Sequence, residues 1–166
     1  MIRLMKYTHL AGQPLAQRHL VIVDAENVAG CAVPSATHAA SSHTALVQAI
    51  PDLESSFVVV ACNHLAAPAV SWEWKRARKL WRSGPNGADL ALLEVLQTED
   101  VDGRFDRVTV CSGDGIFAET VSMLAVVGIR TTVVGLAGHI SAALRLVATI
   151  TIELSTPDEP DTMVAA

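Results

Sequence analysis

Three acidic residues stand at points where one predicted element gives way to the next. Asp24 follows the apolar run 21–23, Asp114 follows the apolar run 108–111, and Asp89 lies in the first turn of a helical stretch that a glycine-rich turn opens. Ligands bind parallel sheets just beyond the carboxyl ends of the strands, so these positions suit chemistry. Carboxylates that gather there repel one another unless a cation joins them, and such oxygen ligands suit Mg²⁺ or Mn²⁺. The pattern therefore points to metal-dependent phosphodiester hydrolysis.

Each acid also has a structural explanation that the sequence leaves open. Asp24 could open a turn or cap a helix, as Asp commonly does. Asp89 is favoured by the helix dipole in a first turn, and Asp114 is a natural N-cap for the stretch that follows it. Glu94 lies five positions beyond Asp89, off the same helix face, so we expect it to be solvated. A common site is favoured because all three aspartates fall on one predicted edge of the sheet.

Apolar runs alternate with helical stretches along the chain. The strand-like runs are 19–23, 56–62, 79–82, 107–111, 130–135 and 148–154, and the helical stretches are 35–50, 66–74, 88–98, 115–127 and 140–147. This alternation indicates βαβ units. We predict an α/β fold with a Rossmann-like, doubly wound, mainly parallel sheet and helices on both faces, giving three α/β/α layers.

Length and composition suit one domain, at 166 residues with 51% hydrophobic content. We place it at residues 18–154, between a mobile N-terminal segment, 1–17, and a disordered acidic tail, 155–166. Residues 1–20 contain no apolar run long enough for a signal sequence or a membrane span, so we expect a cytoplasmic protein without membrane association. The cysteines, Cys31, Cys62 and Cys111, are odd in number, and we predict that all three are reduced and structural.

The charged residues are unevenly distributed. A net charge of −5, from 12 Lys plus Arg against 17 Asp plus Glu, argues against a general nucleic-acid coat protein. Five cations nevertheless fall within eight residues: Lys75, Arg76, Arg78, Lys79 and Arg82. With the indole rings beside it, such a stretch could bind RNA and stack its bases. Alternatively, Trp72, Trp74 and Trp81 pack in or beside the core next to a solvated basic turn.

The order and spacing of the acidic motifs resemble those of the NYN domains, members of the PIN-like ribonuclease superfamily. The resemblance covers roughly residues 20–154 and rests on the segments 24–27, 87–89 and 112–114. It implies a PIN-like fold in which the matching aspartates bind Mg²⁺ or Mn²⁺ for RNA cleavage. Asp24, Asp89 and Asp114 are then the metal ligands and catalytic residues. The resemblance further implies that Asn27 orients the site and that Ser112 helps to shape it.

The chain departs from the family pattern in two places. Family members usually continue the third motif with a second acid, where this chain has Ile116, and many carry an acid near the last strand, where it has residues 148–151 without one. Glu153 comes two or more positions late. The missing ligand puts activity in question and leaves open whether Glu26 or Glu119 takes its place.

The leading hypothesis is a divalent-metal-dependent endoribonuclease acting on single-stranded or structured RNA, with metal-activated water as the nucleophile. A catalytically attenuated module that binds nucleic acid or a protein partner without turnover is the main alternative. An enzyme for a small phosphorylated ligand is a third, weakened because no G-x-G-x-x-G follows the first strand. Related folds often form homodimers, but nothing in the sequence fixes an interface.

Overall fold

The computed structural model describes residues 18–155. Residues 1–17 and 156–166 lie outside the described part, and with them the predicted mobile N-terminal segment and nearly all of the predicted acidic tail. No helix in the part described is long and apolar enough to cross a membrane.

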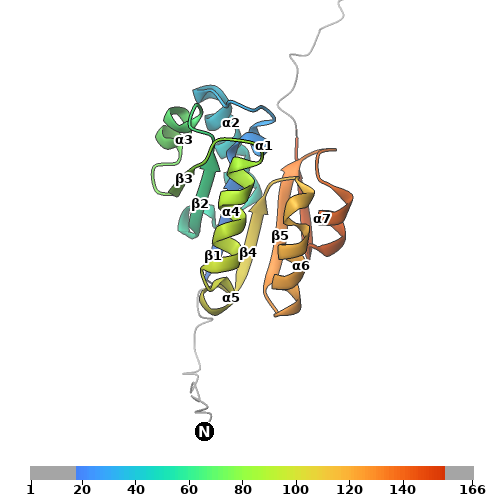
Figure 1. The fold of residues 1–166 in the computed structure, drawn as a ribbon. Helices are drawn as coiled ribbons and strands as arrows, with labels where there is room; N and C mark the ends of the chain where they lie inside the picture. Colours follow the sequence, from blue (N-terminus) through green and yellow to red (C-terminus); the bar gives the residue numbers. More distant parts are fainter. Residues whose placement is uncertain (1–17, 156–166) are drawn as a thin grey trace, which may run out of the picture.

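A six-stranded sheet forms the centre of the fold (Figure 1), and all of its strands are parallel. The strands are β1 (His19–Asp24), β2 (Phe57–Cys62), β3 (Arg78–Trp81), β4 (Arg107–Cys111), β5 (Arg130–Leu136) and β6 (Ile150–Leu154). Their order across the sheet is β3-β2-β1-β4-β5-β6. Because the order runs outward from the centre in both directions, the topological switch point lies between β1 and β4, and ligands of open parallel sheets bind at such a point.

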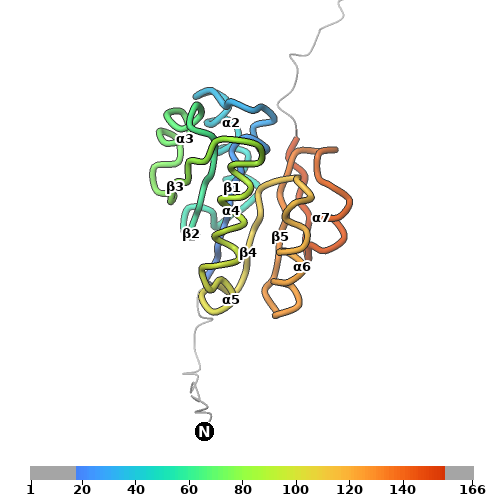
Figure 2. Tube along the Cα trace, viewed as in Figure 1, coloured from blue at the N-terminus to red at the C-terminus, as the bar shows by residue number. Residues whose placement is uncertain are grey.

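Helices cover both faces of the sheet. They are α1 (Ala25–Ala29), α2 (Ala36–Ala49), α3 (Ala67–Glu73), α4 (Gly87–Thr98), α5 (Val101–Arg104), α6 (Ala118–Val126) and α7 (Ala142–Val147), with short 3₁₀ turns η1 (Leu53–Ser55) and η2 (Gly115–Phe117). Side chains of β1 alternate between the two faces, as the pleat requires. Leu20 and Ile22 join the hydrophobic core under α4, α6 and α7, whereas Val21 and Val23 join the core under α1, α2 and α3. Figure 2 follows the crossover from β3 into α4, which carries the chain to the second face.

The predicted three-layer α/β/α fold is confirmed, and all six predicted strands are present. Two short helices, α1 and α5, were not predicted. The helix expected over 115–127 begins as the 3₁₀ turn η2 and becomes α-helical only at Ala118. Cys62 and Cys111 are buried at the ends of β2 and β4, which agrees with the structural role predicted for these two, whereas Cys31 is only partly buried.

Candidate metal centre

Asp24 is the last residue of β1 and lies at the switch point of the sheet. Its Oδ1 accepts hydrogen bonds from the backbone N–H groups of Glu26 and Asn27, each at 3.2 Å, so the side chain caps α1. Helix α1 ends at Gly30, whose φ of 67° is the left-handed conformation that glycine adopts without strain. The capping role anticipated from the sequence is therefore real. Asp24 is nonetheless only 4% exposed, which is unusual for a carboxylate.

Asp89 approaches the same edge from the first turn of α4. The turn before it brings the backbone close together, because a Cβ on Gly87 would lie 2.2 Å from the carbonyl oxygen of Arg82. Only glycine fits there, so Gly87 fixes where α4 begins and hence where Asp89 lies. Asp89 is 8% exposed, and its buried Oδ1 has no hydrogen-bond partner among the described residues. A buried carboxylate oxygen left unpaired is costly, and capping or dipole effects do not account for it.

The loop after β4 supplies the third motif. The Ser112 hydroxyl donates to Asp24 Oδ2 at 3.4 Å and accepts from the backbone N–H of Asp114 at 3.2 Å. Asn27 Oδ1 accepts from the backbone N–H of Gly113 at 2.8 Å, so Asn27 ties α1 to this loop. The absence of a side chain at 113 has a packing reason, because a Cβ there would lie 2.2 Å from the carbonyl oxygen of His139 in the loop after β5.

Asp114 itself is exposed, and its Oδ1 accepts from the backbone N–H of Ile116 at 2.9 Å. It therefore caps its own turn, as one of the structural explanations predicted. Its charge still reaches the buried acids, because it contributes to raising the pKa of Asp89. The structure thus brings Asp24 and Asp89 together and leaves Asp114 beside them at the surface.

The two buried aspartates behave as a coupled pair. Burial, followed by the hydrogen bond to Asp89 and the charge of Asp89, raises the pKa of Asp24 from 3.8 to about 8. The pKa of Asp89 is raised as well, mainly by burial. The hydrogen bond with Asp24 lowers it, but by less than burial raises it. Two carboxyl groups this close hold a proton between them, since both cannot ionise cheaply. With its pKa raised to about 8, Asp24 is the member of the metal-free pair that holds a proton at neutral pH.

Glu26 is a further acid whose charge acts on the pair. Its Oε1 accepts from the backbone N–H of Asn63 at 2.6 Å, which joins the end of β2 to α1, and its charge raises the pKa of Asp24. Glu119 instead lies in a groove of about 450 Å³ between α4 and α6, together with Ile116. Of the two candidates for the missing acid, Glu26 is therefore the one linked to the site.

The fit to a divalent ion rests on the chemistry of the donors. Within residues 18–155, no group of three or more His, Cys, Asp or Glu side chains is already arranged as a metal site. The pair nevertheless offers only oxygen donors, and one of them, Asp89 Oδ1, is buried and unsatisfied. Mg²⁺ and Mn²⁺ are held by one or two carboxylates with water and phosphate oxygens completing the shell. Asp24 and Asp89 fit that minimal requirement, and Asp114 is exposed beside them.

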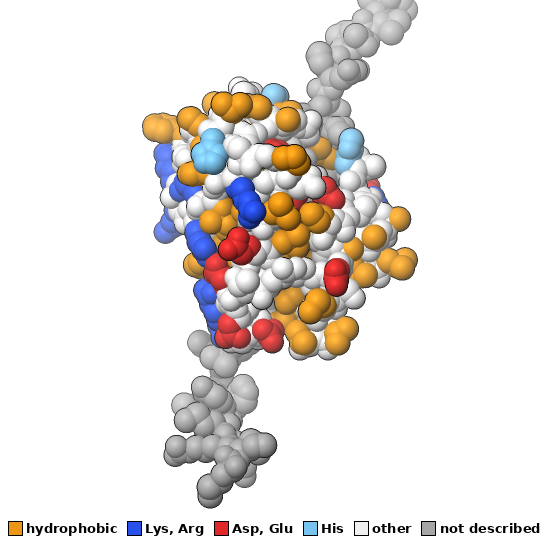
Figure 3. Space-filling model, in the orientation of Figure 1, with side chains coloured by type: hydrophobic (Ala, Val, Ile, Leu, Met, Phe, Trp, Pro, Cys, Tyr) orange, Lys and Arg blue, Asp and Glu red, His pale blue; other side chains and the backbone are white. Residues whose placement is uncertain are grey.

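The basic stretch divides into paired and unpaired cations. Arg78 forms two hydrogen bonds of 2.7 Å with the Glu99 carboxylate, and Lys79 Nζ donates to backbone carbonyls of its own turn. Arg82 lies 3.6 Å from Glu94 in an exposed ion pair, which is weak. Glu94 is solvated as predicted. Figure 3 shows Lys and Arg side chains spread along one side of the molecule, from the level of α3 and β3 down to the level of α5.

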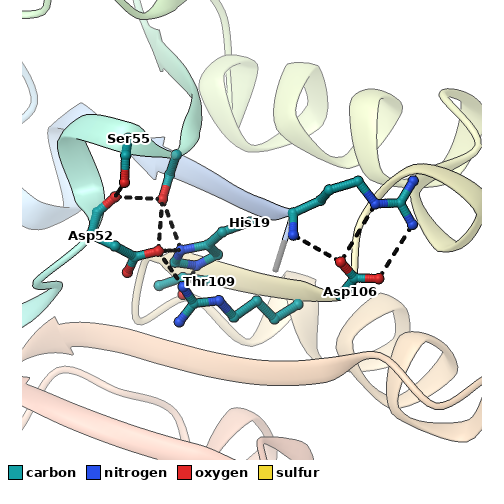
Figure 4. A network of polar contacts seen from close by, with 8 residues as sticks. His19, Asp52, Ser55, Asp106 and Thr109 are labelled. Atoms are coloured by element: carbon teal, nitrogen blue, oxygen red, sulfur yellow. Dashed lines mark hydrogen bonds and ion pairs between the residues drawn. The ribbon is translucent and has the colours of Figure 1, made fainter. Parts of the chain in front are cut away.

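A second polar cluster lies at the opposite, amino edge of the sheet (Figure 4), and no sequence pattern pointed to it. His19 Nδ1 lies 3.0 Å from Asp52 Oδ2 and 2.9 Å from Ser56 Oγ, and Nε2 lies 2.8 Å from Thr109 Oγ1. Arg107 also contacts Asp52. His19 and Thr109 are 5% and 3% exposed, so a substrate has no access to the ring. The cluster joins β1, β4 and the segment before β2, and its role is structural.

Comparisons with known proteins bear on the fold. No protein-family model matches the chain, and no curated protein matches it significantly in sequence. Among solved structures, it is similar to the crystal structure of a protein of unknown function from Vibrio parahaemolyticus, with a TM-score of 0.57 and 15% sequence identity. The similarity covers 89% of this chain and 98% of that chain. The α/β arrangement is thus shared by a solved structure.

Proposed function

We propose that this protein is a divalent-metal-dependent endoribonuclease that hydrolyses phosphodiester bonds of RNA. The observation that carries the proposal is the buried Asp24–Asp89 pair at the switch point, with an unsatisfied oxygen of Asp89. A pair of buried acids weakens the fold unless a cation joins them. The resemblance to NYN domains adds the expectation of Mg²⁺ or Mn²⁺ and of RNA as substrate.

The residues around the pair have distinct tasks in this proposal. Asp24 and Asp89 would hold the ion, and Asp114 would add negative charge at the exposed side of the site. When bound there, a divalent ion supplies an activated water and neutralises charge on the scissile phosphate. Ser112 holds Asp24 through its hydroxyl, and Asn27 holds the loop that carries Ser112 through the N–H of Gly113. Both would keep the carboxylates in place while the ion and substrate exchange.

Arg82 is the cation of the basic stretch that lies nearest to this edge, because it directly follows β3. Its exposed pair with Glu94 is easily exchanged for a phosphate oxygen. Lys75, Arg76, Arg78 and Lys79 lie farther along the same side of the molecule, before or within β3. In the proposed function they steer the RNA backbone toward the acids, although Arg78 must first leave Glu99.

The test is cleavage of a labelled single-stranded RNA with added Mn²⁺ or Mg²⁺, with an EDTA control. Asp24→Asn and Asp89→Asn should abolish metal-dependent cutting, because each removes a carboxylate from the pair. Asp102→Asn is the matched control, since Asp102 is an exposed acid in α5, away from the site. Cutting that survives in Asp24→Asn, or that is lost equally in Asp102→Asn, would refute the assignment.

A binding module without turnover is the second candidate function. It is favoured by Ile116, which lines the α4–α6 groove where the family pattern has an acid, and by the commitment of Asp114 to its own turn. This alternative predicts RNA binding in EDTA with no product in either metal. The cleavage assay, run beside a binding titration, separates the two.

A further inference from the structure

An exposed tryptophan stands at the end of α3. The Trp72 side chain is 73% exposed, whereas Trp74, two residues on, is 4% exposed and packs in the core. A large aromatic ring left in water forfeits the burial that such rings normally gain. Lys75 Nζ lies 4.7 Å from the Trp72 ring centroid, a cation–π contact that holds the ring next to a positive charge. Packing of the fold gives no reason for this arrangement.

Two cations beside this ring are unpaired. Neither Lys75 nor Arg76 forms an ion pair with any acid in the described residues, in contrast to Arg78 and Arg82, which pair with Glu99 and Glu94. Both unpaired side chains are exposed. Lys79 has no acidic partner either, but its Nζ donates to backbone carbonyls of its own turn. Lys75 and Arg76, which directly follow Trp74, are therefore the exposed cations of the stretch that are free to bind an anion.

A cavity of about 260 Å³ opens beside the two cations. Lys75 and Arg76 line it together with Trp74. Leu53 and Val58 make part of the remaining wall apolar, and the acids Glu54 and Glu73 also line it. The wall is held in place by His43, whose ring packs edge-on against Trp74 at 4.5 Å and whose Nδ1 lies 2.9 Å from the Glu73 carboxylate. The cavity is smaller than the usual site for a drug-sized ligand and suits a single flat ring.

We propose that Trp72, Lys75, Arg76 and the adjoining cavity form a docking site for single-stranded RNA, separate from the acids. One base stacks on Trp72, the neighbouring base enters the cavity, and the phosphates around them bind Lys75 and Arg76. Proteins that hold single strands combine cations with aromatic rings in this way. Paired bases are already stacked and cannot use the indole ring, so the site selects unpaired RNA. The inference rests on the proposed function for its substrate, and it narrows that substrate to single strands.

The docking site and the acids are connected through one short helix. Helix α3 starts after the turn that contains Asn63, whose backbone N–H binds Glu26 beside the acids, and Trp72 lies at its far end. Seven residues of helix span about 10 Å. A strand docked on Trp72 therefore needs only a few nucleotides to reach Asp24.

Binding should be measured in EDTA, so that docking is tested without cleavage. The probe is a short labelled oligoadenylate, compared with the same strand paired to oligouridylate, and the readouts are anisotropy and quenching of tryptophan fluorescence. Trp72→Ala should weaken single-strand binding about tenfold, and Trp72→Phe should restore most of it. Lys75→Gln should lower the salt dependence of log affinity by about 0.7. Leu146→Ala is the control, because Leu146 is 87% exposed and lies on α7, across the sheet.

Each outcome decides the proposal. Unchanged affinity in Trp72→Ala, or equal binding of single strand and duplex, would overturn the docking site. Fluorescence quenching by the oligoadenylate that is undiminished in Trp72→Phe would also overturn it, because the quenched tryptophan would then not be Trp72. If the native protein binds the oligoadenylate through Trp72 but cuts no RNA in Mn²⁺ or Mg²⁺, the docking site stands and the nuclease function fails. If the Trp72→Ala variant cuts RNA with the same KM as the native protein, the nuclease function stands and the docking site fails.

Discussion

Replacing Asp24 with Asn should stabilise the metal-free protein, although it should abolish the proposed activity. In the folded chain the pKa of Asp24 is raised from 3.8 to about 8 by burial and by Asp89. A carboxyl group whose pKa rises on folding stabilises the fold fully only below 3.8, and that contribution is lost as the pH increases to about 8. The amide introduced by Asp24→Asn has no such proton to lose. It can also donate to Asp89 through its nitrogen, and its oxygen can still cap α1.

The magnitude follows from the size of the pKa change. Each pH unit between the unfolded and folded pKa values corresponds to about 1.36 kcal/mol, so at pH 7 the ionisable Asp24 costs about 4 kcal/mol relative to a neutral residue. Because Asp89 shares the proton, part of this cost transfers to Asp89 in the variant. We therefore expect Asp24→Asn to raise the free energy of unfolding by about 2–4 kcal/mol at pH 7 and by little near pH 4.

The assay is urea unfolding in EDTA at several pH values between 4 and 8, followed by circular dichroism. The stability gain of Asp24→Asn over the native chain should grow steadily with pH. Asp102→Asn is the matched control, because Asp102 is an exposed acid in α5, away from the pair. A variant that is less stable than the native chain at pH 7, or a gain that does not depend on pH, would refute the buried, coupled pair.

Three further outcomes follow from the same geometry. Mn²⁺ binding to the native chain at pH 7 should release about one proton, measured by calorimetry in two buffers of different ionisation heat, and Asp24→Asn should release none. Gly113→Ala should cost about 2 kcal/mol or more in urea unfolding, because its Cβ would meet the His139 carbonyl at 2.2 Å, whereas Gly115→Ala, facing the Ser141 hydroxyl at 3.2 Å, should cost far less. His19→Asn should lose about 2 kcal/mol at pH 7. The difference in unfolding free energy between His19→Asn and the native chain should shrink below pH 6.5. Burial lowers the pKa of His19 in the folded chain, so below that pH the unfolded native chain binds a proton that the folded one does not. The native chain then loses stability, whereas the variant does not.

The positions of the strands along the chain could be predicted because buried parallel strands consist of short apolar runs. The predicted strand 107–111 coincides with β4, and the others differ from the structure by two residues or fewer at either end. Helix α1 is absent from the prediction because its five residues are too few to show a helical period. Asp24 as N-cap and Gly30 as the residue after the last turn were available as evidence for it. Helices this short are defined by their caps more than by periodicity.

The edge on which the three aspartates meet was predictable, but their orientation was not. Topology places Asp24 at the end of β1 and Asp114 just beyond β4, and these two strands are neighbours in the sheet. Whether a carboxylate faces the site or its own backbone depends on single dihedral angles, and Asp114 bonds to Ile116 while Asp89 Oδ1 stays unpaired among the described residues. Sequence spacing carries no information on that choice.

The tryptophans show where more could have been inferred. Val70 and Trp74 are four positions apart, which puts them on one helix face, and both are buried. Trp72 lies two positions from each and so points away from that face. The sequence spacing therefore predicts different environments for Trp72 and Trp74. Because the three tryptophans were considered as one group, the exposure of Trp72 was not predicted.

Capping explains the presence of an oxygen at position 24 but does not explain a carboxylate there. The two N–H groups of α1 need one acceptor, which Asn supplies as well as Asp does. Asn would also avoid the buried repulsion with Asp89, which amounts to a few kcal/mol in a protein whose total stability is of the order of 5–15 kcal/mol. At position 89, the helix dipole favours an acid equally well when it is exposed to solvent. Here the acid is buried, and one of its oxygens has no partner within residues 18–155. The two residues therefore share a feature that neither local role requires, and the proposed cation, bound between them, would remove the cost at both positions.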